Sequence, residues 1–300
     1  MKNIRVVRLT VATIAALLSL GCGHAKISPP DISLMPATYR CDDCPPPPFV
    51  ARYERRGKRL SYIAARHESG LDSATFALIR AEFAARPPQL VIVEGIPRNA
   101  GDNSPAFVKL INSDPLRMES YYAASLALAG SAVFAGGEPA PQEIKQWLLS
   151  KGYTEKDIFG YSILTEIPVW RRQGGAESFS DFYSAASRNA GRMYKLTGAA
   201  LMSESELAAW YSQRNKKQFD SGAITIQETA PYNAADSLFT QKMDYQVARV
   251  RDAAVCRAIA EGLNRFDRVL VVYGAGHFGM EQKILRKMLG RPVLRTASGP

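Results

Sequence analysis

The sequence predicts an α/β protein with a mixed, largely parallel sheet that is flanked by helices and interrupted by a helical insertion in the middle of the chain. Near both ends of the chain, short apolar runs bounded by polar or turn residues alternate with amphipathic helical patterns. Between about residues 142 and 220 the patterns are helical, with little strand content. The hydrophobic share of 46% in 300 residues is enough for a sizeable core.

The first 22 residues are expected to be a secretory signal rather than part of the fold. MKNIRVVR is basic, LTVATIAALLSL is apolar and GCGHA follows, which is the three-part pattern of an export signal. The apolar run is short for a membrane-spanning helix. LSLGC resembles a bacterial lipoprotein box, so a lipidated Cys22 is expected to hold the protein on the membrane. Ordinary cleavage after Ala25, which would release a periplasmic protein, is the alternative.

Residues 23–50 are rich in proline and predict an extended tether, with one domain over residues 51–300. Cys41 and Cys44 form a CDDC motif directly before a proline run, which excludes the helix that a redox motif needs. In an oxidising compartment this spacing favours a local disulfide. Cys256 lies in an apolar helical pattern and is expected to be a buried free thiol.

The net charge of +10 falls to +7 when the signal and its three basic residues are removed. No dense basic cluster with interleaved aromatic residues occurs, and ARYERRGKRL is the nearest approach to one. A nucleic-acid partner is therefore not expected for this exported chain. Anionic lipid headgroups or cell-envelope polymers are more suitable neighbours, but a solvated basic face without a partner is the favoured explanation of the charge.

The domain is expected to open with a strand at 60–66, a helix at 73–86 and a strand at 89–97. Such a unit implies parallel pairing through a right-handed crossover. A helix at 120–131 then leads into a short apolar stretch at 133–141.

The insertion contains three helical patterns, at 144–152, 179–196 and 204–217. A long helix at 246–266 feeds a buried strand at 266–272. A glycine-rich turn and a short helix at 281–290 complete the predicted domain.

Four polar residues follow predicted strands directly. His67 and His277 come after the first and last strands, and Glu94 and Glu138 end the strands between them. Because ligands of open α/β sheets bind beyond the carboxyl ends of the strands, these side chains are expected to meet in one crevice. Unrelated strand-end residues are the alternative.

Two kinds of chemistry suit this set. His67, Glu94 and His277 could hold a divalent metal that activates water. Alternatively, a histidine and a glutamate could activate water directly as general base. Glu138 is a possible fourth catalytic member, from its position in a GGEP turn.

The strand followed by GAGH, with VRDAAVCRAIAEGL before it, resembles the carboxyl-terminal signature of the TraB/GumN and TIKI superfamily, which is related to erythromycin-esterase-like enzymes and to ChaN-type haem-binding lipoproteins. Members carry two GxxH motifs and an acidic residue on the strand after the first. Gly274–His277 matches the second motif. The first motif has Ala64 in place of glycine before His67, and Glu94 occupies the position of the acid.

The resemblance, over about residues 60–294, implies a hydrolase-like pocket, with Gly274 and Gly276 allowing a ligand to approach the backbone. Metal-dependent peptide cleavage and metal-independent lactone hydrolysis both occur in the superfamily. The expected function is therefore hydrolysis of a peptide or ester bond in a peptide or small-molecule substrate. A non-catalytic haem- or ligand-binding lipoprotein is the alternative, and the alanine at 64 also suits a structural protein with a degenerate pocket.

Other charged residues offer supporting roles. Arg66 and Arg98 could bind an anionic substrate or form ordinary salt bridges. Arg251 and Asp252 could orient the site from behind the catalytic groups. Tyr273, which precedes the glycine-rich turn, is a candidate for contact with a ligand.

Overall fold

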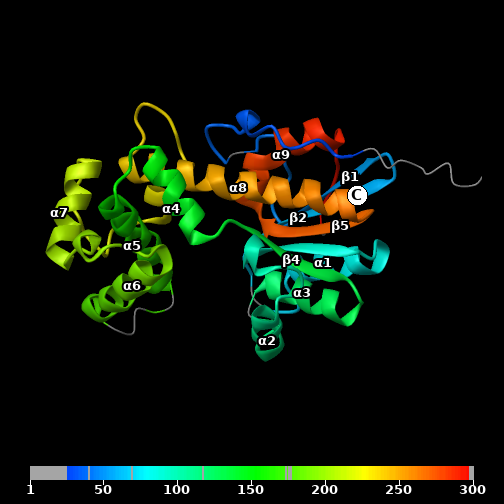
Figure 1. Ribbon diagram of the computed structural model, residues 1–300, viewed down its shortest axis with the longest axis horizontal. Helices are drawn as coiled ribbons and strands as arrows, with labels where there is room; N and C mark the ends of the chain where they lie inside the picture. Colours follow the sequence, from blue (N-terminus) through cyan, green and yellow to red (C-terminus); the bar gives the residue numbers. More distant parts are fainter. Residues whose placement is uncertain are drawn as a thin grey trace, which may run out of the picture.

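A six-stranded sheet runs through the molecule, and helices cover both of its faces (Figure 1). The computed structural model describes residues 26–39, 41–68, 70–116, 118–172, 174 and 178–296, so the predicted signal and Cys22 lie outside the described residues. The strand order is β4-β3-β5-β2-β1-β6. The strands are β1 (Phe49–Arg55), β2 (Lys58–Ala65), β3 (Leu90–Pro97), β4 (Val133–Glu138), β5 (Arg268–Gly274) and β6 (Val293–Thr296). The α/β prediction is confirmed.

Four neighbouring strands, β4, β3, β5 and β2, are parallel. β1 is antiparallel both to β2 and to β6, which makes the sheet mixed. The expected direct pairing of the first two predicted strands is wrong, because β5 lies between β2 and β3. The late strand β5 thus brings the end of the chain into the centre of the sheet, where parallel strands are buried on both faces.

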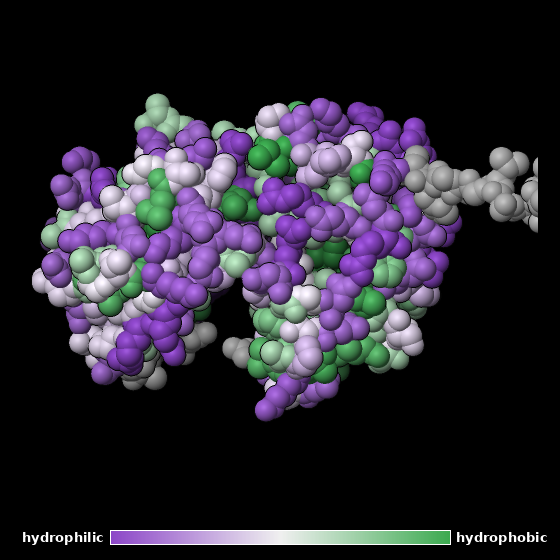
Figure 2. All heavy atoms as spheres, viewed as in Figure 1, coloured by the Kyte–Doolittle hydropathy of each residue, from purple (hydrophilic) through white to green (hydrophobic). Residues whose placement is uncertain are grey.

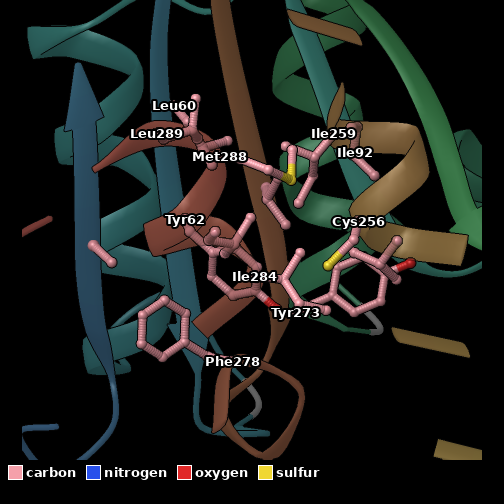
Figure 3. Packing of buried hydrophobic residues seen from close by; sticks show 14 of the residues in the cluster. Leu60, Tyr62, Ile92, Cys256, Ile259, Tyr273, Phe278, Ile284, Met288 and Leu289 are labelled. Atoms are coloured by element: carbon pink, nitrogen blue, oxygen red, sulfur yellow. The ribbon is translucent and has the colours of Figure 1, made fainter. Parts of the chain in front are cut away.

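On one face of the sheet lie α8 (Phe239–Arg265) and α9 (Ala275–Leu289), as Figures 1 and 3 show. Alternate strand residues such as Tyr62 and Tyr273 point into this layer and meet Phe278 and Ile284 of α9. Cys256 of α8 lies in the same cluster as a buried free thiol, as predicted.

On the opposite face lie α1 (Ala74–Ala85), α2 (Pro105–Ser113) and α3 (Glu119–Ala129). Their apolar side chains pack against the other set of alternating strand residues, including Val91, Val93 and Val272. The helix α2 begins inside the sequence NAGDNSPAF, which has the composition of a polar loop. Pro105 at its first position is compatible with a helix start, because that residue needs no intrahelical N–H.

The insertion forms a helical lobe at one end of the molecule (Figure 1). It consists of α4 (Pro141–Ser150), α5 (Glu155–Arg172), α6 (Phe179–Tyr194) and α7 (Glu204–Asn215), with a core of its own. α8 has 27 residues and is about 40 Å long, so its first turns belong to this lobe and its last turns to the sheet.

The predicted tether lies against the domain from Lys26 onwards. Ile27 exchanges hydrogen bonds with the side chain of Asn264 near the end of α8, and Met35 is buried in the core that α8 and α9 share with the sheet. The predicted Cys41–Cys44 disulfide is present. Apolar residues within the proline-rich stretch thus make it part of the fold. Among the described residues, no helix is long and apolar enough to cross a membrane.

The β1–β2 hairpin is a correction to the predicted start of the domain. Its strands contain the basic stretch ARYERRGKRL, and its turn residues Arg56 and Gly57 both have positive φ, of 52° and 80°. Two such residues suit a tight hairpin turn, because their twist matches that of the strands. The charged residues of this stretch mask the alternating apolar pattern of β1, in which Phe49, Ala51 and Tyr53 face the core.

Candidate functional site

The carboxyl ends of β2, β3 and β5 border a cavity of about 600 Å³. His67, Glu94, His277, Gly274 and Gly276 all line it, so these five predicted residues share one site. The facing walls come from α8, from the N-terminal segment and from the stretch around the short helix η4 (Ile226–Thr229). The cavity therefore lies between the sheet and three other elements, and of these only the helix that carries Arg251 and Asp252 was expected from the sequence to contribute to the site.

Strand β5 passes directly into α9 rather than into a glycine-rich turn. Gly274 is the N-cap of α9, and both Gly276 and His277 lie in its first turn. A Cβ on Gly274 would lie 2.8 Å from Nε2 of His67 and 3.4 Å from Oε2 of Glu94. Glycine at 274 thus allows the two side chains to come close to the backbone, whereas a Cβ on Gly276 would meet no atom closer than 3.7 Å.

His277 lies between two carboxylates. Its Nδ1 is 2.5 Å from Oδ1 of Asp252, and its Nε2 is 3.3 Å from Oε1 of Glu94. Burial lowers the pKa of this imidazole, but Asp252 and Glu94 outweigh burial and raise the pKa well above its ordinary value. His277 is therefore an imidazolium whose two N–H groups donate to carboxylates, and it has no free nitrogen to accept a proton.

Glu94 is held as a carboxylate by three groups. Besides His277, the backbone N–H of Gly274 donates to its Oε2 at 2.8 Å, and Arg251 lies 3.4 Å from its Oε1. Burial alone would raise its pKa, yet the charge and hydrogen bond of His277, with Arg251 and the backbone donor, hold that pKa well below the usual range.

Glu138 stands behind Glu94 and does not line the cavity. The guanidinium of Arg251 binds it with two parallel hydrogen bonds of 2.8 Å, from Nε to Oε2 and from Nη2 to Oε1. Such fork-shaped pairing occupies both oxygens. The structure therefore gives Glu138 the role of holding Arg251 against Glu94, which differs from the catalytic position expected from its strand end.

His67 has a different partner, which the sequence analysis missed. Its Nδ1 lies 2.5 Å from Oε1 of Glu119, the first residue of α3, and Glu119 is only 3% exposed. The hydrogen bond that His67 donates to Glu119 is the main cause that raises the pKa of His67, with Glu94 adding to it and burial opposing. The side chain of His67 is 67% exposed, and its Nε2 faces the site beside Gly274. A lone acid at the start of an apolar helix was the available sequence signal for Glu119.

Two buried carboxyl groups, those of Asp252 and Glu281, lie next to His277. Asp252 accepts from the imidazole, and Glu281, one turn further along α9, is fully buried next to it. Burial and the nearby Asp252 raise the pKa of Glu281 well above its usual value, so this carboxyl is neutral. The expectation that Asp252 and Arg251 orient the site agrees with these contacts.

The expected contact of Tyr273 with a ligand does not match the structure, whereas Arg98 forms the ordinary salt bridge that was its alternative. The ring of Tyr273 is fully buried and lies edge-on to His277, with centroids 5.4 Å apart, so it supports the imidazole from the core instead of facing the cavity. Arg98 forms an ion pair with Glu261 at 2.9 Å, away from the cavity lining. Arg66 does line the cavity, at its exposed mouth.

Potential metal ligands gather in two groups among the residues that the structure describes. Ligand atoms of Glu94, Glu138 and His277 lie within 4.8 Å of one another, and so do those of Asp252, His277 and Glu281. His67 belongs to neither group. In the first group the carboxylates already bind Arg251 and His277, which are cations, so a divalent ion there would have to displace them or bear their repulsion.

Comparison of the chain with protein-family models, with curated proteins and with solved structures gives no match.

Proposed function

We propose that this protein is a hydrolase that cleaves a peptide or ester bond with water activated by His67. The observation that carries the proposal is the His67–Glu119 pair at the cavity. The carboxylate of Glu119 fixes Nδ1 of His67, while Nε2 of His67 faces a cavity that also contains the ionised Glu94. A histidine oriented in this way by a carboxylate is the usual general base of hydrolytic sites.

In the proposed reaction His67 acts first as general base and then as general acid. Nε2 of His67 takes a proton from a water molecule as the water attacks the substrate carbonyl. Glu94 and Glu119 stabilise the imidazolium that forms, in keeping with their effect on the pKa of His67. The imidazolium then returns the proton to the leaving amine or alcohol as the carbonyl–heteroatom bond breaks. Arg66 at the cavity mouth supplies positive charge for the oxyanion.

We favour the metal-free form of this chemistry over the metal site expected from His67, Glu94 and His277. Both nitrogens of His277 are engaged by Asp252 and Glu94, and the carboxylate of Glu94 is already neutralised by His277 and Arg251. Protein cations thus occupy the contacts that a metal ion would need. If a metal does bind, its ligands would come from Glu94, Glu138 and His277, with His67 remaining on Glu119.

The decisive experiment measures turnover and metal content on the same tag-free preparation. The protein is assayed against a panel of peptide and ester substrates before and after treatment with a chelator, beside His67→Ala. We expect turnover that survives chelation, no stoichiometric metal, and loss of turnover in His67→Ala with an unchanged circular dichroism spectrum. Turnover that disappears with the metal and returns when metal is added back would replace this mechanism with the metal-dependent one.

A ligand-binding protein remains the second candidate, because apolar residues such as Ile226, Val247 and Met280 share the cavity lining with the exposed imidazole of His67. That combination suits haem, which needs an apolar pocket and an axial nitrogen. Titration with haem distinguishes the two functions. A saturable Soret shift that His67→Ala removes, with no hydrolysis of any panel substrate, would favour the binding protein.

We also propose that the protein works outside the cytoplasm, as a lipoprotein of the bacterial envelope anchored through Cys22 or as a periplasmic protein. The support is the basic, apolar and small-residue pattern of residues 1–25 together with the Cys41–Cys44 disulfide, which suits an oxidising compartment. Metabolic labelling with a radioactive fatty acid tests the anchor, and label in the wild type that is absent from Cys22→Ser is the expected result.

A further inference from the structure

Basic side chains gather at the end of the sheet that lies opposite the cavity. The amino ends of β2, β3 and β5 meet there with the hairpin turn, the last turn of α8 and the last turn of α9. Lys58 Nζ lies 2.8 Å from Asp267 just before β5, and Arg55 donates to the carbonyls of Lys287 and Met288 at the end of α9. The exposed basic residues of this surface, called the basic end below, are Lys26, Arg55, Arg56, Arg59, Lys287 and Arg291.

The carboxylates that lie among these side chains leave an excess of positive charge. Asp267 pairs with Lys58, Asp31 pairs with Lys287 at 2.9 Å, and Glu54 is 3.5 Å from Arg59. Arg56 stands at the apex of the hairpin with a φ of 52°, and Arg55 binds only carbonyl groups among its described contacts. On the face that Figure 2 shows, hydrophilic residues are more frequent than hydrophobic ones at the end where the N-terminal trace leaves the molecule.

The chain enters the fold at the same end. Ile27 is fastened by two hydrogen bonds to Asn264 in the last turn of α8, so Lys26 lies beside the basic end. Lys26 follows Cys22 by four positions, and the chain between them spans at most about 14 Å. A lipid on Cys22 would therefore hold this end of the molecule, and no other, within a short distance of the bilayer.

We propose that the basic end docks on an anionic membrane surface. Three observations agree: the excess of arginine and lysine, the entry of the chain at this point, and the position of the cavity at the opposite ends of the strands. Each Lys or Arg close to an anionic leaflet strengthens binding about fivefold, so a cluster of this size suffices for a docked orientation without insertion.

Docking in this orientation places the cavity on the side away from the membrane. β5 runs from the basic end to Gly274 over seven residues, which is about 23 Å. That length is greater than the Debye length at physiological salt, so the charge of the membrane is screened before it reaches the cavity. Substrates therefore reach the cavity from the aqueous compartment, and bonds within bilayer lipids lie out of reach.

The test compares binding of the 300-residue chain to vesicles of phosphatidylcholine and to vesicles of equal parts phosphatidylcholine and phosphatidylglycerol. The variant Arg56→Asn/Arg59→Gln/Arg291→Gln reduces the charge of the basic end, and asparagine suits the positive φ at position 56. The matched control, Lys156→Gln/Arg188→Gln/Arg192→Gln, removes the same number of positive charges from exposed residues of α5 and α6 in the helical lobe. The apolar N-terminal run is the same in every protein, so its own affinity for lipid cancels.

We expect tighter binding to the anionic vesicles, weakened about tenfold to a hundredfold in the triple variant, unchanged in the control and lost as salt is raised. Equal binding by the wild type and the triple variant would overturn the proposal. So would retention on heparin without any preference for anionic vesicles, because the basic end would then recognise an anionic polymer. Neither outcome depends on whether the cavity is catalytic.

Discussion

At the scale of single residues, the two histidines have opposite roles although each follows the carboxyl end of a parallel strand. His277 donates from both nitrogens, to Asp252 and Glu94, and is fixed as a cation. His67 is fixed on one nitrogen only and keeps the other facing the cavity. The difference comes from the number of carboxylates around each ring, and it assigns proton transfer to His67 and charge balance to His277.

Replacing Glu119 tests the assignment of His67. The base works when neutral, so kcat/KM is expected to rise with pH through the pKa of His67, which lies above its ordinary value. In Glu119→Gln the negative charge that raises this pKa is lost, so the rise moves to lower pH, and the plateau falls about tenfold or more because an amide does not hold the ring in a single tautomer. His67→Ala should lower kcat by about a hundredfold to ten-thousandfold at every pH.

The measurement is a profile of kcat/KM against pH for the wild type and both variants. Glu143→Gln, in the first turn of α4, is a control for changing an acid near a helix start. A rise that stays at the wild-type pH in Glu119→Gln would show that His67 is not the group that titrates.

Replacing His277 tests its role as a buried cation. In His277→Gln, the carboxylate of Asp252 remains fully buried without its positive partner, so the free energy of unfolding should fall by about 3–5 kcal/mol. Because folding raises the pKa of His277, its stabilising effect is complete below the pKa of the unfolded chain and is lost as pH rises through the folded pKa.

Urea unfolding at pH 6 checks this expectation, with Asp252→Asn/His277→Gln as the comparison. The double variant no longer buries an unpaired carboxylate, so its loss of stability should be smaller than the sum of the two single losses. Strict additivity would mean that the two side chains do not form a charge pair.

At the scale of elements, the junction of β5 and α9 sets the distance between His67 and Glu94. Gly274→Ala should lower kcat/KM about tenfold to a hundredfold, because the new Cβ would lie 2.8 Å from Nε2 of His67. The φ of −55° at Gly274 suits alanine, so the midpoint of thermal unfolding should change little. Gly276→Ala is the matched control, since its Cβ has 3.7 Å of space. Equal activity in both variants would contradict the close packing of His67 on Gly274.

The sequence predicted the strand-end residues well because apolar runs such as FDRVLVV show where a parallel strand finishes. It did not show which partner each residue has. Glu119 follows His67 by 52 residues and opens a helix on the other face of the sheet, and no local pattern connects the two. The pairing of β2 with β5 is equally non-local, since it joins Arg59 to Arg268.

Corrections at this scale have local causes. The GAGH stretch resembles a turn because glycine is unfavourable inside helices. In the structure, Gly274 is the N-cap and α9 starts at Ala275, where the first N–H groups have no partner within the helix. The proline-rich start reads as a tether because its composition resembles linkers, whereas a few apolar side chains such as Ile27 and Met35 are enough to fix it on α8 and α9.

At the scale of the whole molecule, α8 joins the helical lobe to the site. Arg251 and Asp252 follow Asp244 by seven and eight residues, which is about two helical turns. The three side chains therefore lie towards the same side of this helix, and all three line the cavity. Tyr161 of α5 donates a hydrogen bond to Asp244, so the lobe contacts the cavity wall directly. The insertion thus has a part in the electrostatics of the site as well as a core of its own.

The burial of Asp244 at the cavity wall should make the free energy of unfolding depend on pH. Burial raises the pKa of Asp244 to about 7, although Tyr161, Arg251 and His277 oppose the shift. Between its ordinary pKa of 3.8 and 7, the folded protein binds a proton that the unfolded chain has released, so the contribution of Asp244 to stability falls as pH rises. The loss is complete above pH 7 and amounts to at most about 4 kcal/mol.

Asp244→Asn removes this titration while leaving an acceptor for Tyr161. The variant should therefore be as stable as the wild type near pH 4 and more stable than it at pH 8, with the difference growing between these values. Urea midpoints measured across that range for the wild type, Asp244→Asn and the exposed-site control Asp236→Asn give the comparison. Parallel curves for the wild type and Asp244→Asn would mean that Asp244 stays ionised in the fold. The cavity wall would then carry a fixed negative charge at Asp244, and an anionic substrate would be disfavoured there.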